Sequence, residues 1–204
     1  MKLEKRSNTK TRVFEAAKTL FSQKGYDAAS VRDICKLADA SITAIRIHFG
    51  SKEQLLDEIL AELDNSVFKA PIRILGGNIQ NKEQFITKFK IFMSETLHAL
   101  LSEKETVLIA VREQHRSKWY LKMGVYHENL VAFIRSAQKN KIVSKSIKVD
   151  LVTGMFMDRL VAQIIFEQGI EEAFENTIRD PIYREEWLDA SLDLLLSGLL
   201  VRKN

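Results

Sequence analysis

The spacing of apolar residues along the chain predicts a protein built from helices. Near the N-terminus they recur at the three- and four-residue spacing of one helix face, at Val13, Ala16, Ala17, Leu20 and Phe21. Gly25 follows as the residue that ends this first helix. Neither strand-like alternation nor an internal repeat competes with the helical pattern, so the predicted fold class is all-α.

Two short helices are predicted next. Ser30 and Asp33 form an N-terminal capping pair, and the apolar face that follows, at Val31, Ile34, Cys35 and Ala38, lasts only about two turns. Asp39-Ala40-Ser41 breaks this second helix, and Ser41 caps a third helix that runs from about Ile42 to His48. Cys35 lies on the inward face, where we expect a small buried side chain rather than a redox site.

Longer helices are predicted for the rest of the chain. Ser51 with Gln54 caps a fourth helix, and Pro71 with Gly76-Gly77-Asn78 interrupts the pattern. Further helices are expected around residues 85–96, 108–112, 121–137, 151–166 and 187–201. The predicted organisation is a small helical domain at 8–50, a connector helix at 51–68 and a larger helical domain at 69–204.

Charge and composition narrow the function classes. Residues 1–52 hold eleven Lys/Arg and five Asp/Glu, so the whole positive excess of the chain lies there and favours a polyanionic partner. The N-terminus is polar and no apolar run is long enough for a membrane helix, which predicts a cytoplasmic protein without membrane contact. One cysteine and four scattered histidines give no metal-ligand spacing, so neither a metal nor a cofactor is expected.

The two short helices have the layout of a helix-turn-helix, whose second helix enters the major groove of DNA. On that helix Ile45 and Phe49 are predicted to face inward and Ile42 to lie at the border. Small side chains at Thr43 and Ala44 suit close approach to bases, whereas basic side chains suit phosphates. The predicted DNA-binding residues are Ser30, Ser41, Ile42, Thr43, Ala44, Arg46, His48 and Lys52.

Residues 11–56 resemble the DNA-binding domain of TetR-type regulators. The pattern of that domain includes an AA-x-x-LF-x-x-x-GY segment, a Ser or Thr at the start of the second helix, and an A-G-V-S-x-G turn that leads to Y-x-x-F-x-x-K, and several glycine, aromatic and capping positions agree in register. The sequence departs from this pattern at Asp39 and Thr43, where Gly is frequent, and at Arg46, where a phosphate-binding Tyr is usual. We expect a positive φ at Asp39, because Asp tolerates that conformation better than most residues.

The resemblance implies a homodimer that binds a roughly palindromic operator in duplex DNA, most often as a repressor that a small-molecule effector releases. An apolar or aromatic effector is expected between the middle helices, at Phe89, Phe92, Met93, Trp119, Met123, Tyr126 and Phe156. Dimerisation is expected on the last two long helices, at Leu151, Met155, Leu188, Leu192, Leu195, Leu196 and Leu199.

Two alternatives stay open at this point. One is a constitutive DNA-binding dimer whose C-terminal part senses no ligand. The other is a helical enzyme that would use His98 or His115 with Glu95 or Glu113. No nucleophile elbow, phosphate loop or metal motif accompanies these residues, so the sequence favours a protein that is not an enzyme.

Overall fold

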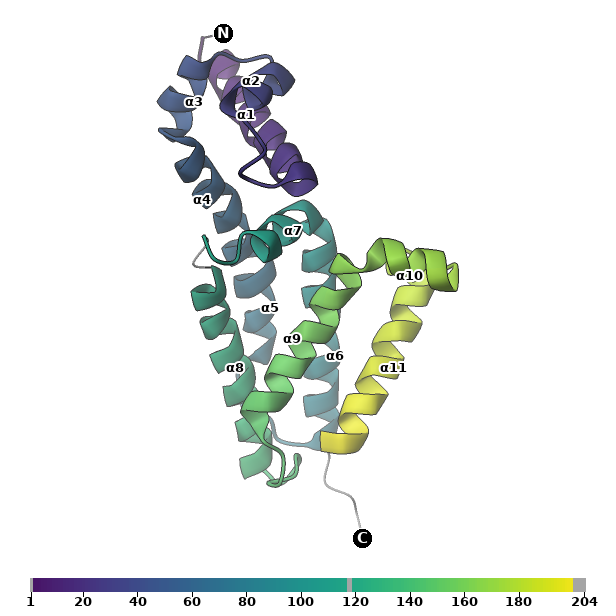
Figure 1. Cartoon of the computed structure of the whole chain (residues 1–204). Helices are drawn as coiled ribbons and strands as arrows, with labels where there is room; N and C mark the ends of the chain where they lie inside the picture. The colour runs from purple at the N-terminus through teal and green to yellow at the C-terminus, as the bar shows by residue number, and fades with distance from the viewer. Residues whose placement is uncertain (1, 117–118, 200–204) are drawn as a thin grey trace. The chain divides into compact units, whose positions relative to one another are not determined.

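Residues 2–116 and 119–199 are described by the computed structural model, with side chains except those of residues 2–8, 64–65 and 119–123. Every regular element within these ranges is a helix, which confirms the predicted fold class (Figure 1). None of the described helices combines the length and the apolar character that crossing a membrane requires.

The chain forms two compact units, and the first is assembled from two separate segments, the first 65 residues and Glu103–Tyr120. Its helices are α1 (Lys2–Lys24), α2 (Val31–Ala38), α3 (Ile42–Phe49), α4 (Lys52–Leu63) and α7 (Lys104–Arg112). Helix α1 packs against the other four, and α7 also packs against α4. Its core includes the fully buried side chains of Val13, Ala17, Phe21, Ile34, Leu55 and Ile59.

The first unit includes most of the predicted connector, up to Asn65, and also residues 103–120. Residues 103–120 follow about 90 residues after α1 in sequence, and the helical pattern assigned them to the larger domain. In the structure Val107, Ile109 and Ala110 of α7 are buried, and α7 packs on α1 and α4 of the first unit. The chain therefore passes between the units three times, after Asn65, after Ser102 and after Tyr120.

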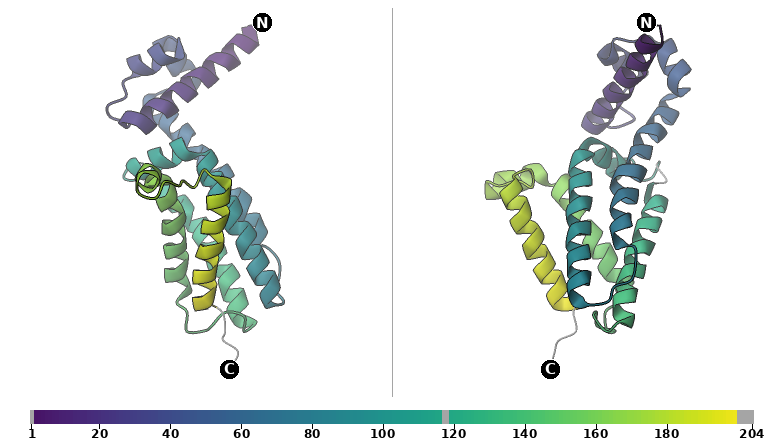
Figure 2. Two further views of the ribbon diagram at one scale, coloured as in Figure 1. Left: turned by 90° about the vertical axis from the view of Figure 1, so that its right-hand side faces the viewer. Right: turned by 180° about the vertical axis from the view of Figure 1, so that it is seen from behind.

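The second unit contains the longer helices. It comprises part of η1 (Asp64–Lys69), α5 (Ala70–Ile72), η2 (Arg73–Leu75), α6 (Lys82–Ser102), most of α8 (Trp119–Lys139), α9 (Val149–Ile165), α10 (Glu167–Phe174) and α11 (Pro181–Leu199). Within this unit α6, α8, α9 and α11 run lengthwise beside one another, and α10 joins α9 to α11 at one end (Figures 1 and 2).

An aromatic cluster fills the centre of the second unit. Phe89 lies with its ring centroid 5.3 Å from Phe156, and Phe92 lies 5.3 Å from Tyr126 and 6.0 Å from Phe156. Phe85 and Phe133 continue the cluster with a centroid distance of 5.2 Å. Such ring pairs stabilise a core beyond the area that they bury. The cluster joins α6, α8 and α9. Helix α11 packs on α6.

One hydrogen bond crosses the cluster. The hydroxyl of Thr96 donates to the carbonyl of Phe92 at 2.8 Å, so the hydroxyl of Tyr126, 3.1 Å away, must donate to Thr96 Oγ1. Burial raises the pKa of Tyr126, and the hydrogen bond with Thr96 opposes this only in part. Tyr126 therefore stays neutral inside the core and keeps its proton for Thr96.

The C-terminal part contains helix that the apolar pattern did not predict. Helix α10 lies between the predicted helices at 151–166 and 187–201, where no helix was expected. Helix α11 begins at Pro181, six residues before the predicted start at Trp187. The Asp180 carboxylate accepts hydrogen bonds from the backbone N–H groups of Ile182 and Tyr183, both at 2.9 Å, and so caps the first turn. Asp-Pro is the signal that would have located this start.

Candidate nucleic-acid interface

The start of α2 is a complete capping box. The backbone N–H of Asp33 donates to Ser30 Oγ at 3.1 Å, and the N–H of Ser30 donates back to Asp33 Oδ2 at 3.2 Å. Lys24 adds a hydrogen bond to the same carboxylate, at 3.1 Å, and with Ser30 it lowers the pKa of Asp33. Ser30 was a predicted site residue. The first backbone N–H groups of α2 after this cap lie at the surface, where an anion can accept hydrogen bonds from them.

The turn between α2 and α3 confirms the expectation at Asp39. This residue has φ 47° and ψ 54°, the left-handed conformation in which Gly is frequent. The backbone N–H of Ala40 donates to the carbonyl of Cys35 at 3.0 Å, which closes the end of α2. Arg12 of α1 donates to the carbonyl of Asp39 at 2.8 Å and holds the turn from outside.

Helix α3 presents most of its side chains to solvent. Ser41 caps it by accepting the N–H of Ala44 at 3.2 Å, and Ile45 and Phe49 are buried as predicted. Thr43 and Arg46 are exposed, whereas Ala44 and His48 are half-buried. Two large apolar side chains are also exposed, Ile42 at 46% and Ile47 at 67%. The exposed surface of α3 therefore combines two isoleucines with Thr43 and Arg46.

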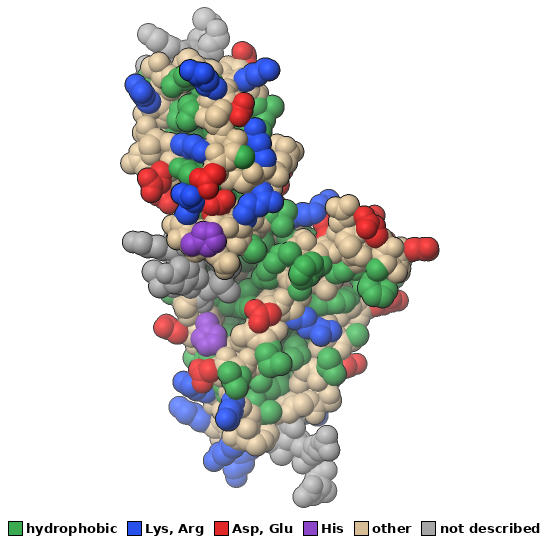
Figure 3. All heavy atoms as spheres, viewed as in Figure 1, with side chains coloured by type: hydrophobic (Ala, Val, Ile, Leu, Met, Phe, Trp, Pro, Cys, Tyr) green, Lys and Arg blue, Asp and Glu red, His purple; other side chains and the backbone are tan. Residues whose placement is uncertain are grey.

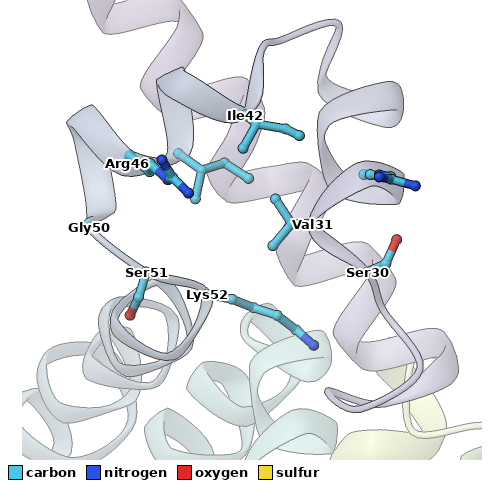
Figure 4. Close-up of a pocket in the computed structure, with 9 residues that line it drawn as sticks. Ser30, Val31, Ile42, Arg46, Gly50, Ser51 and Lys52 are labelled. Atoms are coloured by element: carbon cyan, nitrogen blue, oxygen red, sulfur yellow. The ribbon is translucent and has the colours of Figure 1, made fainter.

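Helices α2 and α3 and the start of α4 enclose an open hollow of about 680 Å³. Figure 4 shows Ile42 and Arg46 of α3 on one side of it, Ser30 and Val31 on the other, and Lys52 reaching across from the start of α4. Arg32 also lines it. Three basic side chains beside a capped helix start form a surface suited to a phosphate backbone.

Lys52 is held in this hollow by an aromatic ring. Its Nζ atom lies 4.0 Å from the centroid of Tyr26, within the range of a cation–π contact. Burial lowers the pKa of Lys52, and Asp27 and Glu113 oppose that shift through their charges. The predicted phosphate-binding side chain is therefore fixed in place before any ligand arrives.

The end of α7 clasps the turn between α1 and α2. We use the term α7 clasp for Arg112, Glu113 and Arg116 together. Arg112 donates to the carbonyl of Ser22 at 3.1 Å, and the buried carboxylate of Glu113 accepts the N–H of Tyr26 at 3.1 Å. The α7 clasp thus binds the last carbonyls of α1 and the first residues of the loop that leads to α2.

Arg116 completes the clasp with two charged contacts. It donates to both carboxylate oxygens of Asp27, at 3.0 and 2.9 Å, and its guanidinium lies 5.3 Å from the Tyr26 ring centroid. Gly25 in the same turn has φ +84°, and a Cβ there would lie 3.3 Å from Arg112 Cδ. Both the left-handed backbone and the closeness of Arg112 explain why this turn requires Gly.

A second network ties α7 to α1 and α4. Lys18 donates to Glu62 at 2.9 Å and to Glu103 at 3.1 Å, and Thr106 donates to the same Glu103 oxygen at 3.3 Å. Burial acts to lower the pKa of Lys18, but the hydrogen bonds to the two carboxylates outweigh it, so the pKa is raised. Lys18 stays charged and joins three helices of the unit.

Sequence reasoning missed several residues of this interface. Arg32 could have been noted as a basic residue two positions after the Ser30 cap. The α7 clasp gave no local signal, because its contacts span 87 to 91 positions in sequence.

The structure also shows where the other predicted sites lie. Five predicted effector residues are buried in the aromatic cluster of the second unit, namely Phe89, Phe92, Met93, Tyr126 and Phe156. The side chains of Trp119 and Met123 lie outside the described residues. The rings pack directly on one another, so this part of the core is filled by the protein's own side chains.

The predicted dimer residues divide into two groups. Four leucines of α11 are buried within the protomer, Leu188, Leu192, Leu196 and Leu199. They face inward because α11 packs against α6. Leu195 is half-buried, whereas Leu151 and Met155 of α9 are exposed. Figure 3 shows hydrophobic side chains spread over the face formed by α9 and α11. Leu194 of α11 is exposed as well.

These features define a helix-turn-helix protein: a supporting helix, two short capped helices joined by a tight turn, and a basic hollow between them. Residues 13–59 match the family model of bacterial regulatory proteins, tetR family. The chain belongs to the TetR family of transcriptional regulators.

Named relatives agree with this assignment. The "Probable HTH-type transcriptional regulator YttP" of Bacillus subtilis (strain 168) is 38% identical over 162 residues, which are 79% of this chain and 65% of the relative. The HTH-type transcriptional repressor KstR2 of Rhodococcus jostii (strain RHA1) is 28% identical over 134 residues, 59% of this chain and 64% of the relative. The chain thus spans less than two thirds of the length of either relative. Both are named as regulators of transcription, not as enzymes, in agreement with the sequence-based exclusion.

A solved structure shows the same fold. The ketosteroid transcriptional regulator KstR2 of Mycobacterium tuberculosis superposes with a TM-score of 0.74, at 18% identity, over 95% of both chains.

The left-handed turn at Asp39 generates a stability prediction. Asp39→Ala should lower the free energy of unfolding by about 1 kcal/mol relative to Asp39→Gly, because Ala resists a positive φ. Urea denaturation followed by circular dichroism measures the difference. Lys36 in α2 is the matched control, since in an ordinary helical position Ala should be more stable than Gly by a similar amount. Equal stability of the Ala and Gly variants at position 39 would contradict the argument.

Proposed function

We propose that this chain regulates transcription by binding duplex DNA as a homodimer, at the two half-sites of a roughly palindromic operator. The hollow between α2, α3 and α4 is the observation that carries the proposal. There Arg32, Arg46 and Lys52 gather beside the capped start of α2. No acidic side chain lines this hollow among the described residues, so its basic side chains and hydrogen-bond donors can bind a phosphate.

Each predicted residue receives a role in this proposal. Phosphates are held by the first backbone N–H groups of α2, which follow Ser30, and by Arg46, Lys52 and the half-buried His48. These contacts fix the position of the unit on the duplex. Ser41 keeps the first turn of α3 intact, so that Ile42, Thr43 and Ala44 face the base edges. Tyr26 supports Lys52 from behind, which reduces the conformational entropy that Lys52 loses on binding.

The face of α9 and α11 is proposed as the dimer interface. Met155 is 68% exposed and Leu194 is 64% exposed, and Leu151 extends the same apolar surface. Large exposed apolar patches of this kind mark protein–protein contacts, and a two-fold pairing of two helices from each protomer would cover it. The buried leucines of α11 then serve a different purpose, because they hold α11 on its own protomer.

Repression with release by an apolar or aromatic effector is the finer part of the proposal. A relative is named as a repressor, and the second unit has an aromatic core with one polar group, the Tyr126 hydroxyl, directed to Thr96. An effector would enter by displacing rings of this cluster, because the described side chains already fill it. If no effector displaces these rings, the alternative is a constitutive DNA-binding dimer.

The α7 clasp and α4 give this effector a route to the DNA-binding unit. Helix α7 is covalently continuous with α6 and α8 of the second unit, but it packs on α1 and α4. A shift of α6 or α8 would therefore displace α7. This displacement would reach Lys18 through its hydrogen bond to Glu103, and the Gly25–Asp27 turn through the ion pair of Arg116 with Asp27. Because half-sites on one face of DNA lie about 34 to 36 Å apart, a small tilt of both reading helices suffices to lose register.

Salt dependence of DNA binding tests the main proposal. Binding to duplexes selected from a random pool should weaken steeply as salt rises, and Arg46→Ala should flatten the slope by about one ion per subunit, since one phosphate contact is lost. Fluorescence anisotropy over a salt series measures this. Lys145→Ala, which removes an exposed positive charge from the second unit, should keep the wild-type slope. Binding that ignores salt, or an equal effect of both variants, would refute the interface.

Dimerisation is tested on the exposed residues of the face. Met155→Glu with Leu194→Glu should convert the dimer into folded monomers, because association would bury charges without partners at a cost of several kcal/mol. Sedimentation gives the mass, and circular dichroism shows that the helices remain. Leu37→Glu is the control, since Leu37 is 55% exposed on α2 of the other unit. An unchanged dimer in the double variant would assign the interface elsewhere.

Reciprocity tests the effector. Apolar and aromatic compounds are titrated against Trp187→Phe, in which Trp119 is the remaining tryptophan, while operator affinity is measured in parallel. A true effector must weaken DNA binding, and saturating DNA must weaken effector binding by the same factor, roughly 5- to 150-fold for typical couplings. A compound that binds equally well with and without DNA is no effector. An experimental structure whose core is filled through residues 119–123 would favour the constitutive alternative.

A further inference from the structure

The outer surface of α3 has an unusual composition for a helix that reads DNA. Its eight residues, Ile42–Phe49, include no Asn, Gln, Asp or Glu. Of the large side chains that it exposes, two are isoleucines, Ile42 at 46% and Ile47 at 67%, and one is Arg46. Ile45 and Phe49 make the buried contact of α3 with the core, so the exposed parts of Ile42 and Ile47 are open to a ligand.

The two isoleucines lie about 140° apart around the axis of α3, so each would meet the DNA at a different point. At about 100° per residue, Ile47 lies about 40° around the helix axis from Thr43, on the side opposite the buried Ile45 and Phe49. Ile42 lies in the first turn, directly after the Ser41 cap, and faces the hollow (Figure 4). N-terminal residues of such a helix approach base edges.

The chemistry of the major groove limits what these side chains can recognise. Asn and Gln pair with adenine, and Glu and Asp accept from cytosine, but α3 has none of them. Arg46 can bind guanine or a phosphate. An isoleucine can recognise one feature of the groove edge, the C5 methyl group of thymine, which is the apolar group that the four bases present there.

We infer that α3 reads its DNA site largely through thymine methyl groups, with Ile42 and Ile47 as the specificity-determining contacts. This inference rests on the proposed function, since it assumes that α3 enters the major groove. It predicts that the preferred half-site contains thymines at fixed positions, and that their methyl groups, not their hydrogen-bonding atoms, carry the preference.

Uracil substitution isolates the methyl group. A duplex selected from a random pool by the full-length protein is synthesised with uracil replacing one thymine of each half-site in turn, which leaves every hydrogen-bonding atom in place. At the contacted positions affinity should fall about fourfold per half-site, the factor expected for one methyl group transferred from water to an apolar contact. Elsewhere in the duplex uracil should have no effect.

Protein variants then assign each methyl group to its partner. Ile42→Ala should bind the thymine and uracil duplexes equally at one position, and Ile47→Ala should do so at another, while Ile42→Val keeps most of the discrimination. Both isoleucines are exposed, so the variants should fold, as circular dichroism can verify. Leu37→Ala is the matched control, because it removes an equally exposed apolar side chain from α2 and should keep the wild-type ratio of thymine to uracil affinity.

The outcomes separate the inference from the proposed function. If the wild-type protein binds its selected duplex with steep salt dependence but tolerates uracil at every position, methyl readout is refuted and DNA binding stands. If both isoleucine variants discriminate uracil as strongly as the wild-type, other residues read the methyl groups and the assignment is overturned. If no duplex is enriched from the pool, the proposed function fails and the inference fails with it.

Discussion

The orientation of α2 and α3 depends on the short turn that follows α1. Gly25 begins this turn with a positive φ, and the α7 clasp then fixes it through Ser22, Tyr26 and Asp27. Without these contacts the turn would be an exposed loop held only by its ends. With them, the capped start of α2 and the ammonium of Lys52 occupy defined positions, because Tyr26 connects the clasp to Lys52. Preorganisation of this kind reduces the entropic cost of binding a phosphate backbone.

The helix pair and the contacts that support it are specified in different ways. The helix pair is specified by local chemistry: two serine caps, one left-handed residue and a few inward side chains. The pair is placed on α1 by the buried core and is linked to α7 by charged and aromatic contacts, of which Arg116 with Asp27 is exposed and Glu113 is buried. An exposed ion pair can be broken at modest cost, whereas the packed core responds as a whole. A regulator needs a rigid helix pair to recognise DNA, and contacts around it that can change.

Local signals in the sequence predicted the N-terminal fold well. The caps at Ser30, Ser41 and Ser51, the stop at Gly25 and the conformation of Asp39 all act within four residues of themselves, so composition and spacing suffice to find them. The inward positions of Ile45 and Phe49 followed from helical periodicity. What periodicity could not show is which neighbour an apolar face meets. The leucines of α11 formed the expected stripe, but that stripe packs on α6 of the same protomer.

Contacts between distant segments lay outside the reach of sequence reasoning. The 87 positions between Tyr26 and Glu113 carry no pattern that links them. Likewise, the aromatic residues of α6, α8 and α9 could be predicted as core or as pocket lining, and only their mutual packing shows that the described rings fill the space. The degree of exposure of Ile47 is likewise a property of the folded unit.

The discontinuous first unit has a consequence for synthesis on the ribosome. Its helices α1 to α4 emerge first, but the unit lacks α7 until the chain has been extended from Asn65 to Tyr120. At typical translation rates those residues require roughly 3 to 11 s. During that interval Lys18 has only Glu62 as a partner, and the apolar surface of α1 and α4 that α7 will cover is open to water. The first unit is therefore completed only after α6 of the second unit has been made, which couples the maturation of the two units in time.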